Sequence, residues 1–325
     1  METRALARTG PALTRFGLGM AALGRPAYIT RGHGEDLPPG RSLEAVEAHA
    51  HRVLDRAFAA GIRYFDAARS YGRAEQFLRA WIDSRGIRDA EIVVGSKWGY
   101  RYTGEWEVDG RVQEVKDHSV AMLQAQATES TAILGPYLRL YQIHSATAET
   151  RVLENEQVLA ALRRLREGGL FLGVTATGAA QAQTIRRAMD IRFDGLPLFS
   201  AVQATWNLLE PSAGPALREA HQAGFTVLVK EPLANGLLTS REAARGPLAE
   251  VAERLHATED AVALAAVVQQ PWADVILLGA ATPEQVDSNL RAADLSLSPE
   301  NLMTLAGLRQ VPAEYWDRRS RLPWN

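Results

Sequence analysis

Short apolar runs alternate along this chain with longer stretches in which apolar residues recur at helical spacing. The runs have the length of strands buried on both faces, and their separation is that of a βα unit. Eight strands are predicted in this way: 15–19, 63–66, 92–97, 138–144, 170–175, 201–203, 226–230 and 275–278.

Amphipathic helices are predicted between these strands. Several of them end at glycine, where a left-handed C-cap costs least, as at Gly61, Gly135, Gly168 and Gly224. The predicted helices include 42–60, 119–134, 154–167, 181–189, 213–223 and 283–293.

The alternation favours parallel strands joined by right-handed crossovers, and eight units favour a (β/α)8 TIM-type barrel with its active site at the C-terminal ends of the strands. The rival fold is an open doubly wound sheet. Its fingerprint, G-x-G-x-x-G after a strand, is missing here, since Gly17 and Gly19 share only its beginning. We therefore expect residues 1–325 to form a single barrel domain, with loops 24–41 and 99–115 and tail 311–325 over the rim.

Composition narrows the choice of partners. The 325 residues are 46% hydrophobic, and 36 basic against 38 acidic residues give a net charge of −2, so neither nucleic acid nor an anionic membrane is expected to bind. The longest apolar run, 261–268, is too short to cross a bilayer. Without cysteine or a clear histidine ligand spacing, no disulfide and no metal site are expected. We expect a cytoplasmic protein with a small-molecule carbonyl or alcohol substrate, and its oligomeric state stays open.

Four polar residues lie near the ends of successive predicted strands: Asp66, Tyr71, Lys97 and His144. A lysine that closes a buried strand needs a counter-charge, which Asp66 supplies. An acid, an amine, a phenol and an imidazole together can deliver a proton to a carbonyl oxygen. In this arrangement Lys97 is expected to lower the pKa of Tyr71, while His144 orients the substrate oxygen.

Each of these residues also has a structural interpretation when it is taken alone. Asp66 and Lys97 suit an ion pair of a barrel core, His144 a hydrogen-bonded interior histidine, and Tyr71 an aromatic residue of the rim. All four fall at the same end of their strands and form one complete proton-transfer unit, and this conjunction favours a catalytic role.

Several motifs resemble the aldo-keto reductase family. Residues 61–72, Gly-Ile-Arg-Tyr-Phe-Asp-Ala-Ala-Arg-Ser-Tyr-Gly, look like its signature, in which a strand-end Asp precedes the catalytic Tyr by five residues. Val-Val-Gly-Ser-Lys at 93–97 and Leu-Tyr-Gln-Ile-His at 140–144 resemble its lysine and histidine strands. The resemblance continues through 173–175, 202–207, 232–238 and 279–285 and covers nearly the whole chain.

The resemblance implies an oxidoreductase that reduces an aldehyde or ketone with NADPH or NADH and with Tyr71 as proton donor. Trp206 is expected to stack on the nicotinamide, with Gln203 and Thr175 near its carboxamide. The expected cofactor-binding residues are Met20, Thr175, Gln203, Trp206, Leu233, Asn235, Gly236, Leu237, Gly279, Gln285 and Asn289. Trp98 and Tyr100 are expected to contact the substrate in an aromatic-lined pocket mouth.

Departures from the family pattern bear on the cofactor. Residues 279–285, Gly-Ala-Ala-Thr-Pro-Glu-Gln, lack the basic side chains that clamp the extra phosphate in NADPH-preferring members. The sequence therefore predicts that NADH is accepted, or that NADPH is held through Arg291 or another residue. Lys230 and Glu231 replace an aromatic and a serine before Pro232, and Glu231 is expected to repel a pyrophosphate unless Lys230 neutralises it.

Three functions are compatible with these observations. The first is a nicotinamide-dependent reductase of aldehydes or ketones. The second is an NAD-dependent sugar or alcohol dehydrogenase that uses the same site. The third is a cofactor-binding regulatory subunit, in the manner of potassium-channel β-subunits. The presence of all four residues Asp66, Tyr71, Lys97 and His144 disfavours this third function.

Overall fold

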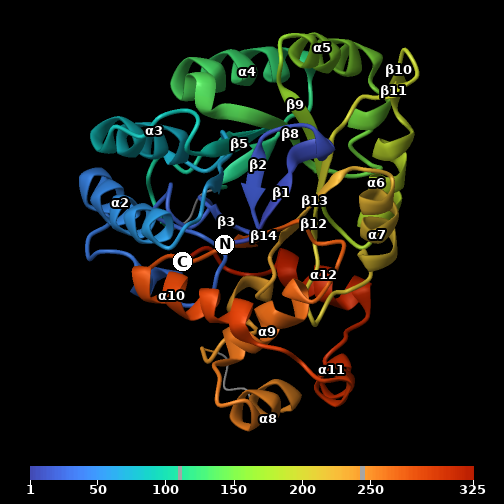
Figure 1. Ribbon diagram of the computed structural model, residues 1–325. Helices are drawn as coiled ribbons and strands as arrows, with labels where there is room; N and C mark the ends of the chain where they lie inside the picture. The colour runs from blue at the N-terminus through green and yellow to red at the C-terminus, as the bar shows by residue number, and fades with distance from the viewer. Residues whose placement is uncertain (109–111, 242–245) are drawn as a thin grey trace.

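Eight parallel strands close into a barrel in the computed structural model, which describes residues 1–108, 112–241 and 246–325 (Figure 1). Each strand pairs with the strand that follows it around the barrel, and β14 pairs with β3 to complete the ring. The (β/α)8 barrel predicted from the alternation is confirmed. The barrel strands are β3 (Phe16–Gly19), β4 (Tyr64–Asp66), β5 (Val93–Trp98), β8 (Leu138–Ala146), β9 (Phe171–Ala176), β12 (Ala201–Thr205), β13 (Thr226–Lys230) and β14 (Val275–Leu278).

Helices surround the barrel as an outer layer (Figure 1). In α2, the buried residues Val46, Ala50, Val53 and Leu54 recur at intervals of four, three and one, which places them on one helical face. The helices are α1 (His33–Asp36), α2 (Leu43–Ala59), α3 (Ala74–Arg85), α4 (Val120–Leu134), α5 (Glu156–Glu167), α6 (Gln181–Asp190), α7 (Gly214–Gln222), α8 (Pro247–Arg254), α9 (Glu259–Val268), α10 (Pro283–Leu290), α11 (Pro299–Ala306) and α12 (Pro312–Ser320).

A hairpin of β1 (Thr3–Ala5) and β2 (Ala12–Thr14) lies at the N-terminal end of the barrel strands (Figure 1). Between the two strands, the Ala7 N–H donates to the hydroxyl of Thr226, the first residue of β13, at 2.8 Å. Leu6 and Leu13 are fully buried in a cluster with inward side chains of the barrel, among them Tyr64 and Leu140. Because apolar side chains fill this end, the opposite end is left for a ligand.

The segments expected over the rim carry more regular structure than their composition predicts. Loop 24–41 contains α1, and loop 99–115 contains the antiparallel pair β6 (Tyr100–Tyr102) and β7 (Glu114–Lys116), while its residues 109–111 lie outside the described part. Tail 311–325 was expected to be irregular, but it forms α12. Its helical pattern is weak in the sequence because Tyr315 is the buried residue of an otherwise polar helix, which starts at Pro312. A further two-residue pair, β10 (Arg192–Phe193) and β11 (Leu196–Pro197), lies far from the rim loops in sequence.

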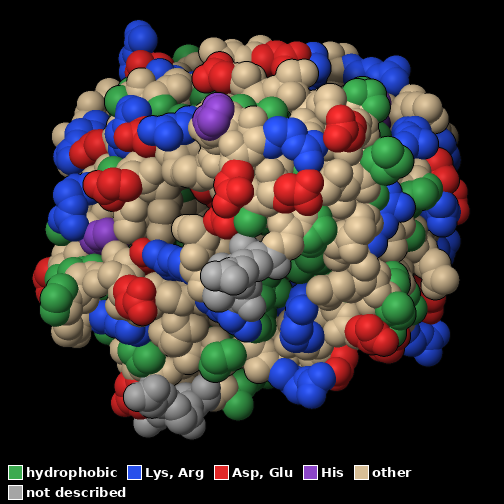
Figure 2. Space-filling view, turned by 90° about the horizontal axis from the view of Figure 1, so that it is seen from below, with side chains coloured by type: hydrophobic (Ala, Val, Ile, Leu, Met, Phe, Trp, Pro, Cys, Tyr) green, Lys and Arg blue, Asp and Glu red, His purple; other side chains and the backbone are tan. Residues whose placement is uncertain are grey.

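Charged side chains of both signs are interspersed over the face shown in Figure 2, with hydrophobic side chains scattered among them. Among the described residues, no helix combines the length and the apolar character needed to span a bilayer. The described residues likewise hold no group of three His, Asp or Glu side chains placed to share a metal ion.

Candidate active site

The structure brings the four predicted residues together at the C-terminal end of the barrel. Asp66 is the last residue of β4, Lys97 lies one residue before the end of β5, and His144 lies near the end of β8. Tyr71 belongs to the turn between β4 and α3. Parallel pairing of β4 with β5 and of β5 with β8 sets the three strand ends side by side.

Lys97 and Asp66 form a buried ion pair in which the two residues are 1% and 2% exposed. The Lys97 ammonium also donates to the Ala67 carbonyl at 2.9 Å. Asp66 Oδ1 accepts further hydrogen bonds from Tyr64 Oη and Gln142 Nε2, both at 3.1 Å. The charges are therefore paired and hydrogen-bonded on both sides, which is the condition for keeping them inside a barrel.

Tyr71 and His144 lie against this pair. Their ring centroids are 5.5 Å apart in an edge-to-face arrangement, and Lys97 Nζ lies 4.8 Å from the centroid of the Tyr71 ring. Ser70 Oγ lies 3.5 Å from Nδ1 of His144. The phenol ring and the imidazole ring therefore lie against each other at this end of the barrel.

Burial determines the protonation states of both rings. It raises the pKa of Tyr71 well above its usual value of 10, and the negative charge of Asp66 acts in the same direction. Burial likewise lowers the pKa of His144 well below 6.5, assisted by the positive charges of Lys97, Lys230 and Arg25. Both rings are therefore neutral near pH 7. The pKa of Tyr71 is therefore raised in the free protein rather than lowered as expected, because burial and the charge of Asp66 dominate.

Arg25, which no sequence motif singled out, lies over the face of the Tyr71 ring. It is 1% exposed, and its guanidinium carbon is 5.1 Å from the Tyr71 ring centroid and 4.6 Å from that of Trp324. Nη1 donates to the Ser70 carbonyl at 3.1 Å and to Glu114 at 3.0 Å. Arg25 opposes the effect of burial on the pKa of Tyr71. It also connects the turn that carries Tyr71 to the C-terminal tail.

A cavity of about 570 Å³ extends from these residues across the rim. Tyr71, His144 and Tyr100 line one end, and Gly279, Gln285 and Asn289 line the other. The volume lies within the range of about 300–1,000 Å³ that is typical of ligand and cofactor sites.

The expected cofactor residues divide into two groups. Those that line the cavity are Gln203, Leu233, Asn235, Gly236, Gly279, Gln285 and Asn289, whereas Met20, Thr175, Trp206 and Leu237 do not. Trp206 packs edge-on against Trp272 with ring centroids 5.6 Å apart, and Thr175 uses its hydroxyl to accept from the Ser145 N–H at 2.6 Å. Both side chains contact the protein, and the predicted contacts of Trp206 and Thr175 with a nicotinamide stay predictions.

The two expected substrate residues, Tyr100 and Trp98, lie in different surroundings. Tyr100 lines the cavity with its ring centroid 4.9 Å from that of His144. Trp98 is fully buried, belongs to the hydrophobic core and packs against His118 at a centroid distance of 5.6 Å. Trp98 therefore faces the protein interior, because adjacent strand residues point to opposite sides of the sheet and Lys97 occupies the inward position. Arg291 is exposed and does not line the cavity.

Glu231 is neutralised by the C-terminal helix. Arg319 in α12 forms an ion pair with its carboxylate, with Nε at 3.0 Å from Oε1 and 3.2 Å from Oε2. The Thr205 hydroxyl donates to Glu231 Oε2 at 3.1 Å. Burial acts to raise the pKa of Glu231, but Arg319, Lys230 and these hydrogen bonds lower it to about 2. The carboxylate that was expected to repel a phosphate therefore points to Arg319, 88 residues away in the sequence.

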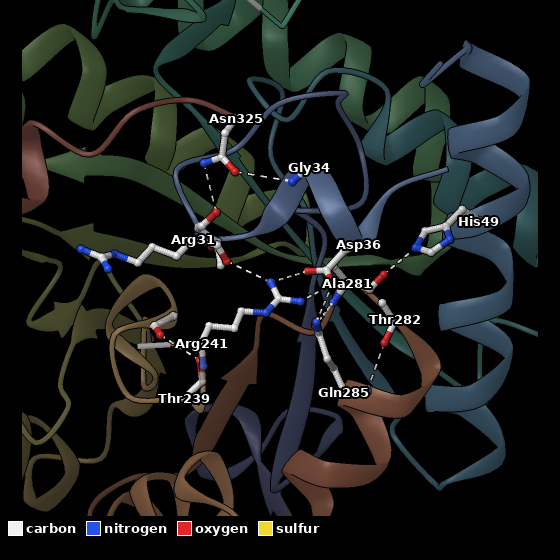
Figure 3. A network of polar contacts seen from close by, with 12 residues as sticks. Arg31, Gly34, Asp36, His49, Thr239, Arg241, Ala281, Thr282, Gln285 and Asn325 are labelled. Atoms are coloured by element: carbon white, nitrogen blue, oxygen red, sulfur yellow. Dashed lines mark hydrogen bonds and ion pairs between the residues drawn. The ribbon is translucent and has the colours of Figure 1, made fainter. Parts of the chain in front are cut away.

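Two segments, those of Arg241 and Gln285, hold loop 24–41 against the rim, and Figure 3 shows their contacts. Arg241, which follows β13, pairs with both carboxylate oxygens of Asp36 and donates to the Arg31 carbonyl at 2.9 Å. Gln285 at the start of α10 donates to Asp36 Oδ1 at 3.0 Å. We name these three side chains, Asp36, Arg241 and Gln285, the Asp36 clasp. It closes loop 24–41 over the far half of the cavity.

Two buried polar side chains of the cavity wall lack hydrogen-bond partners in the described part of the chain. Both ring nitrogens of His33 and Oδ1 of Asn235 are unpaired, although both residues are buried and line the cavity. Buried polar atoms are nearly always satisfied, so these groups indicate a polar ligand in the cavity. A nucleotide, with its ribose hydroxyls and phosphates, would supply such polar groups.

Comparisons with known proteins agree with this geometry. The sequence profile of the Aldo/keto reductase family matches residues 32–310. The chain is 26% identical over 276 residues to a norsolorinic acid reductase of Emericella nidulans, covering 78% of this chain and 70% of that protein. It is 25% identical over 353 residues to a pyridoxal 4-dehydrogenase of Microbacterium luteolum, covering 94% and 96%.

A solved aldo-keto reductase of Bacillus halodurans, in its holo form, has the same fold. It superposes with a TM-score of 0.71 at 20% identity, covering 95% of this chain and 97% of that one. The family match spans most of the barrel and includes the Asp66, Tyr71, Lys97 and His144 positions. This chain is a member of the aldo/keto reductase family of oxidoreductases.

Proposed function

We propose that this protein is a nicotinamide-dependent carbonyl reductase in which Tyr71 donates the proton. The observation that carries the proposal is the position of the neutral Tyr71 phenol, at one end of a long cavity and against the buried pair of Lys97 and Asp66. A phenol with a raised pKa is a donor at neutral pH and a poor base.

The chemistry of reduction assigns a separate task to each group. A carbonyl oxygen at the end of the cavity accepts hydrogen bonds from Tyr71 Oη and from an N–H of neutral His144. A reduced nicotinamide, when bound, supplies hydride to the carbonyl carbon. As negative charge develops on oxygen, the phenolic proton moves to it, and the nearby Lys97 ammonium stabilises the tyrosinate that remains. Asp66 keeps that ammonium oriented.

Turnover with a panel of aldehydes and ketones tests the proposal. With NADH or NADPH present, the absorbance of the reduced nicotinamide should fall with at least one member of the panel. Alcohols and sugars with NAD⁺ or NADP⁺ provide the reverse assay, because faster oxidation than reduction would identify a dehydrogenase. Absence of turnover in both directions would contradict the proposal and favour a regulatory subunit.

We propose NADH as an accepted cofactor. The stretch 280–285 has no basic side chain, and the cavity wall around it carries the carboxylates of Asp36 and Glu284. Arg241 also lines this end, but its guanidinium is paired with Asp36. In a fluorescence titration, we expect any preference for NADPH over NADH to stay below tenfold, or about 1.4 kcal/mol. A larger preference would mean that a basic group, with Arg241 the first candidate, binds the additional phosphate.

The Asp36 clasp is expected to slow cofactor release. Arg241→Gln removes an ion pair whose side chains are 30% and 7% exposed, at an expected cost of about 1 kcal/mol. We therefore expect NADH to dissociate about fivefold faster in stopped-flow fluorescence. Arg88→Gln, which removes an exposed pair with Glu91, is the matched control. An unchanged rate in Arg241→Gln would show that loop 24–41 does not limit release.

A further inference from the structure

Two amide side chains, Gln285 and Asn289, line the end of the cavity that lies away from Tyr71. The Gln285 amide is engaged on both sides, because its Oε1 accepts from the Ala281 N–H at 2.8 Å and its Nε2 donates to Asp36 (Figure 3). Asn289 donates through its Nδ2 at 2.7 Å, but its Oδ1 has no hydrogen-bond partner among the described residues. The Asn289 carbonyl oxygen is therefore left for a ligand.

The partner of Asn289 Nδ2 is Asp260, which lies in the first turn of α9 and also lines the cavity. A carboxylate accepts hydrogen bonds and does not donate, so Asp260 holds the NH2 group of Asn289 and excludes the flipped amide, in which two oxygens would face each other. Asn289 is 4% exposed, and the hydroxyls of Thr258 and Ser288 lie 3.2 Å apart and link α9 to α10. The orientation of the Asn289 amide is therefore set by the protein before a ligand binds.

We propose that Asp260 is a positioning residue that makes this end of the cavity select adenine, because it forces Asn289 to offer a hydrogen-bond acceptor to the base. The inference rests on the proposed use of a nicotinamide dinucleotide. Hydride has to reach a carbonyl beside Tyr71, so the nicotinamide belongs at that end and the other base at the end of Asn289. The resemblance implied a cofactor contact for Asn289, and Asp260 determines which of its two amide groups makes that contact.

The selection follows from the groups that the two purines present. Adenine carries an amino group at position 6, which donates to an acceptor such as Asn289 Oδ1. Hypoxanthine carries an oxygen there, and this oxygen would face the Asn289 oxygen. The amide cannot turn to compensate, because turning would break its hydrogen bond to Asp260. A site built around one hydrogen bond rejects an analogue that cannot make it, so Asp260 should control specificity as well as affinity.

The test titrates the protein with NADH and with reduced nicotinamide hypoxanthine dinucleotide, in which an oxygen replaces the 6-amino group, and follows the fluorescence of the nicotinamide. We expect the unmodified protein to bind NADH at least tenfold more tightly, or about 1.4 kcal/mol. Asp260→Asn keeps the shape but no longer dictates the orientation, because an amide both accepts and donates. It should reduce the ratio to about twofold, mainly because the hypoxanthine compound binds better. Asn289→Ala should give a ratio of about one.

Asp287→Asn is the matched control. Asp287 is an acidic residue of α10, two positions before Asn289, but it pairs with Arg56 and does not line the cavity. Its preference for NADH should equal that of the unmodified protein. Since Asp260→Asn and Asp287→Asn each remove one negative charge, their comparison separates the orientation of Asn289 from a general effect of charge.

The outcomes distinguish this inference from the proposed function. Equal affinity of the unmodified protein for both dinucleotides overturns the role of Asp260 and leaves the reductase function intact. A preference for NADH that survives in both Asp260→Asn and Asp260→Ala also overturns it, and so does an equal loss of preference in Asp287→Asn. Failure of the unmodified protein to bind either dinucleotide removes the nicotinamide-dependent function itself.

Discussion

Tyr71→Phe should reduce kcat by a factor of about 10² to 10⁴, because it removes the proton donor and keeps the ring. The ring contacts with His144 and Arg25 need no hydroxyl, so the pocket should keep its shape. The dissociation constant for NADH should change by less than about twofold. Steady-state turnover and a fluorescence titration of the same preparation measure the two effects.

Tyr137→Phe is the matched control for this variant. It also removes a buried phenol hydroxyl, which donates to the Ile87 carbonyl at 2.6 Å, but Tyr137 lies outside the cavity. Its kcat should stay within about twofold of the unmodified protein. If Tyr71→Phe kept more than about a tenth of the activity, another group would have to be the proton donor.

Lys97→Met should be among the most destabilising single substitutions in this protein. It leaves the Asp66 carboxylate buried without its counter-charge, and the loss of one partner of a buried pair costs about 3–5 kcal/mol. Catalysis should fall as well, because the ammonium that lies against the Tyr71 ring is lost. Urea unfolding at neutral pH gives the change in the free energy of unfolding.

The double variant Asp66→Asn with Lys97→Met separates charge from packing. It removes both charges, so it should be more stable than Lys97→Met alone while remaining inactive. The amide oxygen that replaces the Asp66 carboxylate can still accept from Tyr64 Oη and Gln142 Nε2. A double variant less stable than the single one would show that Lys97 contributes mainly through packing.

The pattern of apolar runs in the sequence was sufficient to predict the barrel and to predict that Asp66, Lys97 and His144 lie close together. The apolar runs that end at Asp66 and Lys97 are adjacent parallel strands, and parallel pairing alone brings their ends together. His144 follows from the same rule through the pairing of β5 with β8. The position of Tyr71 came from the family signature, since the turn that carries it has no periodicity.

Side chains just beyond the strand ends could not be placed from the sequence. Trp206 follows β12 and packs on Trp272. Strand periodicity ends with the strand, so the direction of the next side chain depends on its neighbours. Trp98 is different, because it is the last residue of β5 and the alternation of side chains from Lys97 places it in the core. The helical form of residues 312–320 was missed for a related reason, because one buried residue, Tyr315, gives no visible period.

The sequence by itself determined the closed barrel, the end of it that carries chemistry, and the residue types available there, because hydrophobic periodicity and strand direction are local properties. Only the tertiary structure decided which charges are paired. Arg319 pairs with Glu231, Trp324 covers Arg25, and Lys230 forms no ion pair among the described residues, although the charge of Glu231 acts on its pKa. These partners come from segments up to about 300 residues apart, and their approach depends on how the tail folds back over the rim.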